Sequence, residues 1–224
     1  MRRRRRIPDS GWKKWERHVA TLFSRWLAQG GTGVESERIL SRQALMGRMV
    51  ERTYGDLTVH PKCAERFLPA ARWFMGRVQA DAKNRKAFRL PGLLTAPAHP
   101  FWGWWDKLSE ETPRYRREMI PPAEGEAKWR TNEWGKVRMM VVMNAPSKEH
   151  LLVLGFGDMD FFESAMGGMG KEIPTMEIRR VHTEDAVKIV VLEDFLEWAD
   201  PVSLGCPKVE VGDVSGEAGE VRQG

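Results

Sequence analysis

The stretch that decides the fold runs from residue 54 to 85 and reads YGDLTVHPKCAERFLPAARWFMGRVQADAKNR. A Gly-Asp turn leads into a short apolar segment at 57–59, which predicts a strand. The segment 77–83, RVQADAK, predicts a second strand that ends in Asp-x-Lys. Because successive side chains of a strand point to opposite faces, Asp81 and Lys83 share one face. We therefore expect a carboxylate and an ammonium group to project side by side.

Asp56 stands immediately before the first of these strands. If the two strands are neighbours, Asp56, Asp81 and Lys83 converge. Carboxylate oxygens are the ligands that Mg²⁺ prefers, and one or two of them suffice when substrate phosphate completes the shell. A lysine beside the metal can orient or help to deprotonate the attacking water. The pattern therefore favours a phosphodiesterase site.

Each part of this pattern also has a simpler interpretation. Gly-Asp is a common turn, and Asp-x-Lys is a common solvated ion pair. The interpretation as a site depends on all the elements occurring in order in a basic protein.

These residues resemble the signature of the PD-(D/E)xK nucleases, in which an acid begins one strand and an acid-x-Lys triplet lies on the next. Glu16, in the segment WKKWER, matches the glutamate that the first helix of that family often supplies. The order of helix glutamate, Gly-Asp, Asp-x-Lys-Asn and a Trp-rich helix resembles the phage and archaeal Holliday-junction-resolvase-like branch, over roughly residues 8–160. The chain has no proline before Asp56, its triplet acid is Asp where many relatives have Glu, and 67–74 resembles an inserted, partly helical segment.

The resemblance implies an α/β domain with a restriction-endonuclease-like mixed β-sheet flanked by helices. It implies hydrolysis of DNA that depends on Mg²⁺, with Mn²⁺ as a substitute. Asp56, Asp81 and the backbone carbonyl of Ala82 would ligate the metal, and Lys83 would position the water. Glu16 would bind a second metal or orient a metal-bound water.

The same resemblance implies branched four-way DNA junctions as partner and a homodimer as the active form, because a junction needs two symmetric nicks. One alternative is another nuclease of this superfamily that acts on ends or on specific sequences. A second is a non-enzymatic nucleic-acid-binding protein. The apolar patch of a dimer is expected either on the stripe of Trp102 and Trp105 or on the hairpin at 137–156. Core packing is the simpler role for the tryptophans, and stacking on unpaired bases is a further alternative.

Composition favours a polyanionic partner. The chain has 224 residues, a formal net charge of +5 and a sequence pI of about 9.4. Its two cysteines, Cys63 and Cys206, make no disulfide framework, which predicts the cytoplasm, or the host cytoplasm for a phage-encoded protein. No stretch approaches the length of a membrane span, so no membrane partner is expected.

Three regions are expected along the chain: a disordered basic arm at 1–7, a nuclease domain at 8–200 and a disordered acidic tail at 201–224. The arm contains a run of five arginines, from Arg2 to Arg6. It is interpreted equally well as a phosphate-binding segment or as a solvated tail.

Basic and amide side chains on both sides of the predicted site are candidates for DNA binding, with a solvated surface loop as the alternative for some of them. They are Arg38, Arg42, Arg48, Arg52, Asn84, Arg85, Lys86 and Arg89.

Periodicity predicts the remaining elements. Helices are expected at 10–28, from 101 onward, at 158–166 and at 193–199; strands at 34–41, 137–143, 151–156, 176–181 and 187–192; and irregular chain at 91–100 and 113–132.

Overall fold

The computed structural model describes residues 11–43, 55–83, 88–96, 99–112, 116–120, 130–144, 147–166, 172–180, 183 and 185–209. Predictions that fall on other residues lie outside this described part of the chain.

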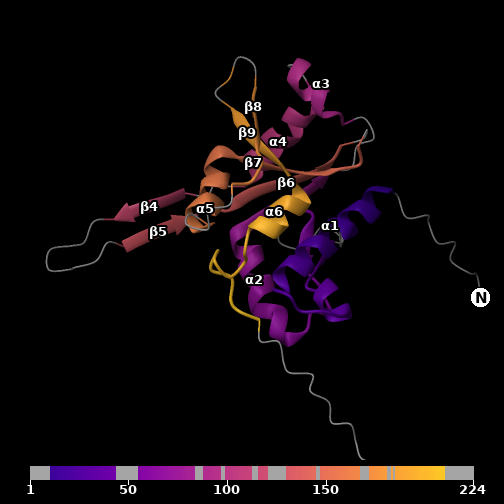
Figure 1. The fold of residues 1–224 in the computed structure, drawn as a ribbon, viewed down its shortest axis with the longest axis vertical. Helices are drawn as coiled ribbons and strands as arrows, with labels where there is room; N and C mark the ends of the chain where they lie inside the picture. The colour runs from indigo at the N-terminus through magenta and orange to yellow at the C-terminus, as the bar shows by residue number, and fades with distance from the viewer. Residues whose placement is uncertain are drawn as a thin grey trace, which may run out of the picture.

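A five-stranded mixed sheet organises the described part of the molecule (Figure 1). Its order is β3 (Val78–Lys83), β6 (Val137–Met143), β7 (His150–Gly155), β9 (Ala186–Val191) and β8 (Met176–Arg179). β3 and β6 are parallel, and the other neighbours are antiparallel. The predicted hairpin is confirmed as β6 and β7, and β6 pairs with β3, the strand that carries Asp-x-Lys.

Helices cover both faces of this sheet. On one face lie α1 (Gly11–Leu27), α2 (Leu68–Arg77), α5 (Phe156–Met166) and α6 (Leu192–Trp198); on the other lie α3 (Leu90–Thr95) and α4 (Pro100–Glu111). Met139 and Val141 pack on the first side, whereas Met140 and Val142 pack against α4. Because both faces are covered, β6 is a nearly continuous apolar run. The predicted mixed sheet flanked by helices is confirmed.

Two small strand pairs stand outside this sheet. β1 (Leu40–Arg42) pairs with β2 (Leu57–Val59), and β4 (Arg116–Ile120) pairs with β5 (Arg130–Trp134), both antiparallel. The β4–β5 ribbon projects from the body in Figure 1.

Helix α1 forms as its periodicity predicts. Trp15, Val19, Phe23 and Leu27 recur at helical spacing and are all buried. The helix ends where the chain turns left-handed, with Gly30 at φ 88°. No helix in the described residues is both long and apolar enough to cross a membrane.

Three secondary-structure predictions are wrong. The strand expected at 34–41 is a 3₁₀ helix, η1 (Val34–Glu37), followed by the short β1. The hydroxyl and the backbone N–H of Ser36 both donate to the carbonyl oxygen of Gly33, and these bonds close the turn of η1. The loop expected at 91–100 contains α3, because proline is compatible with a first helical turn. The irregular segment at 113–132 contains β4 and the start of β5. The predicted helical character of 67–74 is confirmed by α2, which follows η2 (Glu65–Phe67).

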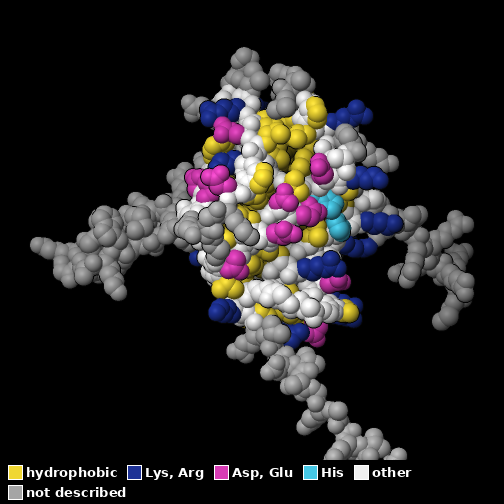
Figure 2. Space-filling view, in the orientation of Figure 1, with side chains coloured by type: hydrophobic (Ala, Val, Ile, Leu, Met, Phe, Trp, Pro, Cys, Tyr) yellow, Lys and Arg dark blue, Asp and Glu magenta, His cyan; other side chains and the backbone are white. Residues whose placement is uncertain are grey.

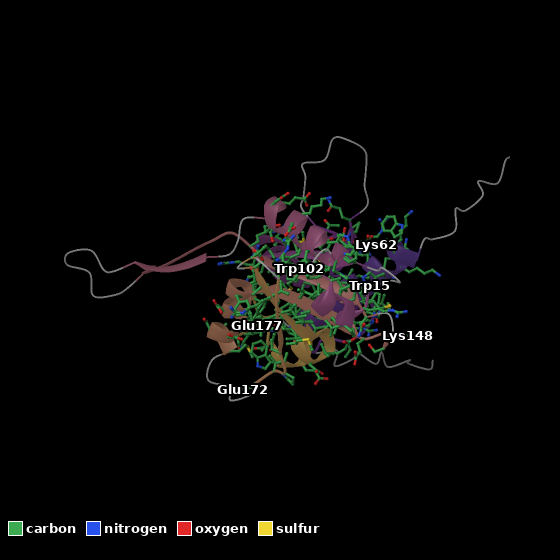
Figure 3. All side chains as sticks on the ribbon, turned by 90° about the horizontal axis from the view of Figure 1, so that it is seen from above. Trp15, Lys62, Trp102, Lys148, Glu172 and Glu177 are labelled. Carbon is green, nitrogen blue, oxygen red and sulfur yellow. The ribbon has the colours of Figure 1, made fainter. Side chains whose placement is uncertain are left out.

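The tryptophan stripe belongs to the core. Trp102, Trp105 and Leu108 are only 2%, 5% and 3% exposed, and they pack between α4 and the sheet. Figure 3 shows Trp102 within the body of the molecule. Its roles as dimer patch or as base-stacking surface are therefore wrong. The apolar side chains of β6 and β7 are likewise buried, because both are inner strands of the sheet.

The expected tail begins too early at residue 201. Leu204 and Cys206 are buried. The Gln29 side chain donates to the carbonyl of Pro207 at 2.8 Å and accepts from the N–H of Val209 at 3.0 Å. The packed chain thus reaches Val209, and the remainder of the predicted tail, like the predicted arm, lies outside the described residues.

Candidate active site

Asp56 docks on the outer edge of β3. Its N–H donates to the carbonyl of Ala80 at 3.0 Å, and its Oδ2 accepts from the N–H of Ala82 at 2.9 Å. The carbonyl of Asp56 accepts from the N–H of Gln43 at 2.8 Å. β2 and β3 do not pair as strands of one sheet, but β3 is an edge strand, and its backbone groups hold Asp56 there.

A glycine precedes Asp56 because no other residue fits. Gly55 has φ +108°, in the region that favours glycine. A Cβ at this position would lie 2.7 Å from Nε2 of Gln79 and 2.8 Å from the carbonyl oxygen of Ala80. The close approach of the Gly55 backbone to β3 therefore sets where Asp56 stands.

Asp81 and Lys83 share a face of β3, as predicted. Lys83 Nζ lies 2.7 Å from Oδ1 and 2.6 Å from Oδ2 of Asp81. The same Nζ lies 3.8 Å from Oδ2 of Asp56. The side chains of Asp56, Asp81 and Lys83 are 28%, 14% and 29% exposed, so the cluster is sheltered but open to solvent. The structure thus brings together the three residues of the predicted strand motif.

The two carboxyl groups perturb each other strongly. Burial, together with the hydrogen bond and charge of Asp81, raises the pKa of Asp56 to about 8. Burial alone would raise the pKa of Asp81, but its bond to Asp56 and the charge of Lys83 outweigh burial and lower this pKa. The pair therefore holds one proton at neutral pH.

Glu16 faces inward beside this cluster. It is 7% exposed, and its Oε2 lies 3.6 Å from Nη1 of Arg42. Burial raises the pKa of Glu16, against the opposing charges of Arg42 and Lys83, and the charge of Asp81 adds to the rise. Glu16 therefore lies within electrostatic reach of the cluster, with Arg42 as its ion-pair partner.

The donor set fits a hard divalent cation with few protein ligands. Within the described ranges, no group of three or more His, Cys, Asp or Glu side chains is arranged to hold a metal ion. Mg²⁺, however, commonly takes one or two carboxylates and completes its shell with water and phosphate. Asp56 and Asp81 offer two carboxylates close enough to share a proton, and a cation would replace that proton. Ala82 contributes its N–H to Asp56, and its carbonyl as a ligand remains a prediction.

The predicted DNA-binding residues divide by position. Arg42 forms an ion pair with Glu16 beside the site, whereas Arg38 and Arg89 are exposed on the surface. The other predicted members lie outside the described residues; they are Arg48, Arg52, Asn84, Arg85 and Lys86.

Two residues near the site were missed by sequence reasoning. Gln79 lies two residues before Asp81 and therefore on the same face of β3, which strand alternation could have indicated. Its side chain is only 1% exposed and lies beside the backbone of Gly55. Lys107, on α4, helps to lower the pKa of Asp81, and no local pattern connects it with β3.

No family model matches the chain, and comparisons with curated proteins and with solved structures also found no match.

Proposed function

We propose that this protein is a metal-dependent DNA endonuclease of the PD-(D/E)xK type, with a restriction-endonuclease-like fold. The observation that carries the proposal is the hydrogen bond from Ala82 N–H to Asp56, which holds one carboxylate beside Asp81 and Lys83. Asp-x-Lys alone would be an ordinary ion pair. A second carboxylate fixed to the same strand is what favours a site.

The perturbed carboxyl pair adds a second argument. Burial and the neighbouring Asp81 disfavour the charged form of Asp56 and raise its pKa, whereas the pKa of Asp81 is lowered. Strong shifts of this kind, caused by burial and a specific charged neighbour, are typical of functional sites.

The chemistry assigned to the cluster is hydrolysis of a phosphodiester. Bound at Asp56 and Asp81, Mg²⁺ would lower the pKa of a water and offset the charge of the phosphate. Lys83 positions the attacking water and stabilises the charge that grows on the phosphate oxygens. The water gives up a proton to solvent, and its oxygen bonds to phosphorus in line with the P–O3′ bond. That bond breaks, and the leaving O3′ takes a proton from solvent, so the products are a 5′-phosphate and a 3′-hydroxyl.

The proposed substrate is a four-way DNA junction, and the proposed active form is a homodimer. Two symmetric nicks across a junction require two sites related by a two-fold axis. The net charge of +5 is compatible with a DNA partner.

The test is cleavage of a synthetic four-way junction and of a linear duplex, with and without Mg²⁺. Wild-type protein should nick the junction in a metal-dependent manner. Asp81→Asn should abolish nicking, while DNA binding survives or tightens because one negative charge is removed. Asp160→Asn, an exposed acid on α5, is the matched control and should cleave as wild type does.

Three results contradict the proposal in different ways. Wild-type turnover by Asp81→Asn removes this carboxylate from the mechanism. Preference for linear ends or one sequence identifies a different nuclease of the same superfamily. Tight DNA binding with no cleavage in Mg²⁺ or Mn²⁺ identifies a non-enzymatic binding protein.

A further inference from the structure

The first turn of α1 carries a tryptophan on the outside of the molecule. The side chain of Trp12 is 44% exposed. By contrast, the side chains of Trp15, Trp26, Trp102 and Trp105 are buried in the core. A large part of the Trp12 ring is therefore accessible to a partner.

Two cations flank this ring. Nζ of Lys13 lies 5.5 Å from its centroid, and Cζ of Arg42 lies 5.7 Å from it, both within the range of a cation–π contact. Figure 2 shows Lys and Arg side chains gathered on the side of the molecule where α1 begins. The ring thus stands in a positively charged surface, which is complementary to a polyanion.

The ring is also connected to the candidate active site. Trp12 and Glu16 are four residues apart and share one side of α1. Arg42 contacts both, through the Trp12 ring and through Oε2 of Glu16 at 3.6 Å. Glu16 in turn lies within reach of the charges of Asp81 and Lys83. Arg42 therefore contacts both the Trp12 ring and Glu16, and Glu16 is influenced by the charges of the cluster.

We propose that Trp12 is a stacking platform for an unpaired DNA base next to the phosphate that lies at Asp56 and Asp81. This inference rests on the proposed function and narrows its substrate class to DNA with unstacked bases beside the cleaved bond. Arg42 contacts the phosphate between the stacked base and the site. Stacking on an indole tolerates every base, because each base has a π face.

This platform distinguishes unpaired from paired DNA. In a continuous duplex both faces of a base are covered by its neighbours, so the ring has nothing to stack on. At a branch, flap or end a base can leave the helix and cover the exposed ring. Trp12 therefore favours branched and single-stranded DNA without reading sequence.

The test measures binding without metal, so that no cleavage occurs. Two fluorescent probes are compared by anisotropy: a short oligothymidylate and an abasic oligomer with the same number of phosphates. Trp12→Ala should weaken thymidylate binding by about 5- to 150-fold, the equivalent of stacking worth about 1–3 kcal/mol, and leave abasic binding unchanged. Trp12→Phe should retain part of the affinity. Met176→Ala, an apolar side chain that is 43% exposed on the opposite edge strand β8, should match wild type.

Two outcomes overturn the inference. Equal weakening of both probes shows that Trp12 acts through Arg42 on the phosphates, and no change in either shows that the ring does not meet DNA. Junction cleavage without base-dependent binding by Trp12 removes this inference alone. Base-dependent binding in a protein that cleaves no DNA removes the nuclease proposal alone.

Discussion

Asp56 and Ala82 are joined by a hydrogen bond of 2.9 Å from backbone N–H to carboxylate, although 26 residues separate them in the chain. Ala82 is the middle residue of the Asp-x-Lys triplet. The side chains on either side of it, Asp81 and Lys83, point to the face where the Asp56 carboxylate arrives. Together with the bond from Asp56 N–H to the carbonyl of Ala80, this bond holds the Asp56 carboxylate at the cluster, and it uses one oxygen of that carboxylate.

Gly55→Ala should disturb the cluster without altering any of its charged groups. The added Cβ meets backbone oxygen of Ala80 at 2.8 Å, and φ +108° strains any other residue. We expect a loss of about 1–3 kcal/mol in the free energy of unfolding and a loss of junction cleavage. Thermal unfolding and single-turnover cleavage measure these.

The matched control for this substitution is Gly76→Ala in α2, where a Cβ meets nothing within 4 Å. That variant should be as stable as wild type or gain about 0.5–1 kcal/mol. Unchanged cleavage by Gly55→Ala would show that the position of Asp56 is not critical.

The local part of the site was predictable, because strand alternation puts Asp81 and Lys83 on one face. The helical repeat likewise turned Glu16 inward. The docking of Asp56 on β3 was only a conditional expectation, because edge contacts between distant segments leave no periodic signal. Arg42 was predicted as a phosphate ligand, and its bond to Glu16 depends on β1 packing beside α1.

The errors arise where a short stretch of sequence is compatible with more than one structure. The stripe of Trp102 and Trp105 is apolar whether it meets its own sheet or a second copy, so its pattern does not identify its partner. The α3 segment was mistaken for a loop because its Pro91 is equally compatible with a first helical turn. The predicted start of the tail is wrong because Gln29, which is distant in sequence, forms a hydrogen bond with Pro207.

The shared proton predicts how stability changes with pH. The folded-state pKa of Asp56, about 8, exceeds its ordinary value of 3.8, so the folded protein binds an extra proton between these limits. The free energy of unfolding therefore falls as pH rises through this window, and the contribution of neutral Asp56 is lost above it. The pKa of Asp81 is lowered instead, so the stability that its charged form contributes is lost only at more acidic pH.

Melting temperatures of wild type and Asp56→Asn from pH 5 to 9 check this, and the wild type should show the steeper decline. Mg²⁺ should stabilise wild type more at high pH, since the cation displaces the proton. A Mg²⁺ effect that is the same at both ends of the range, or that persists in Asp56→Asn, would contradict the assignment.

Glu16→Gln tests the role of the helix glutamate. If this acid orients a metal-bound water or a second ion, the Mg²⁺ concentration for half-maximal cleavage should rise by about 10- to 100-fold. DNA binding in the absence of metal should not weaken. Glu177→Gln, an exposed acid on β8, is the control. An unchanged metal requirement would leave Glu16 only as the partner of Arg42.

The buried pair of Arg138 and Asp158 predicts a stability defect that involves none of the proposed catalytic residues. Nη2 and Nε of Arg138 lie 2.8 Å and 3.0 Å from Oδ2 of Asp158, which is fully buried. Asp158→Asn leaves a buried guanidinium without its counter-charge and should cost about 3–5 kcal/mol. Asp106→Asn, which breaks the more exposed pair with Arg180, should cost less than about 1 kcal/mol. Chemical denaturation measures both, and similar losses would show that burial does not separate the two pairs.

Deleting Arg2 to Arg6 separates DNA affinity from selectivity. If these arginines contact phosphates, junction and duplex binding should weaken by similar factors, because phosphates are alike in both. The slope of log affinity against log salt should flatten by up to about 0.9 for each lost contact. Cleavage of bound junction should persist, since Asp56, Asp81 and Lys83 are untouched. A salt titration of both proteins on both substrates, with single-turnover cleavage alongside, measures each effect. Loss of junction preference at unchanged duplex affinity would instead show that the arm reads DNA structure.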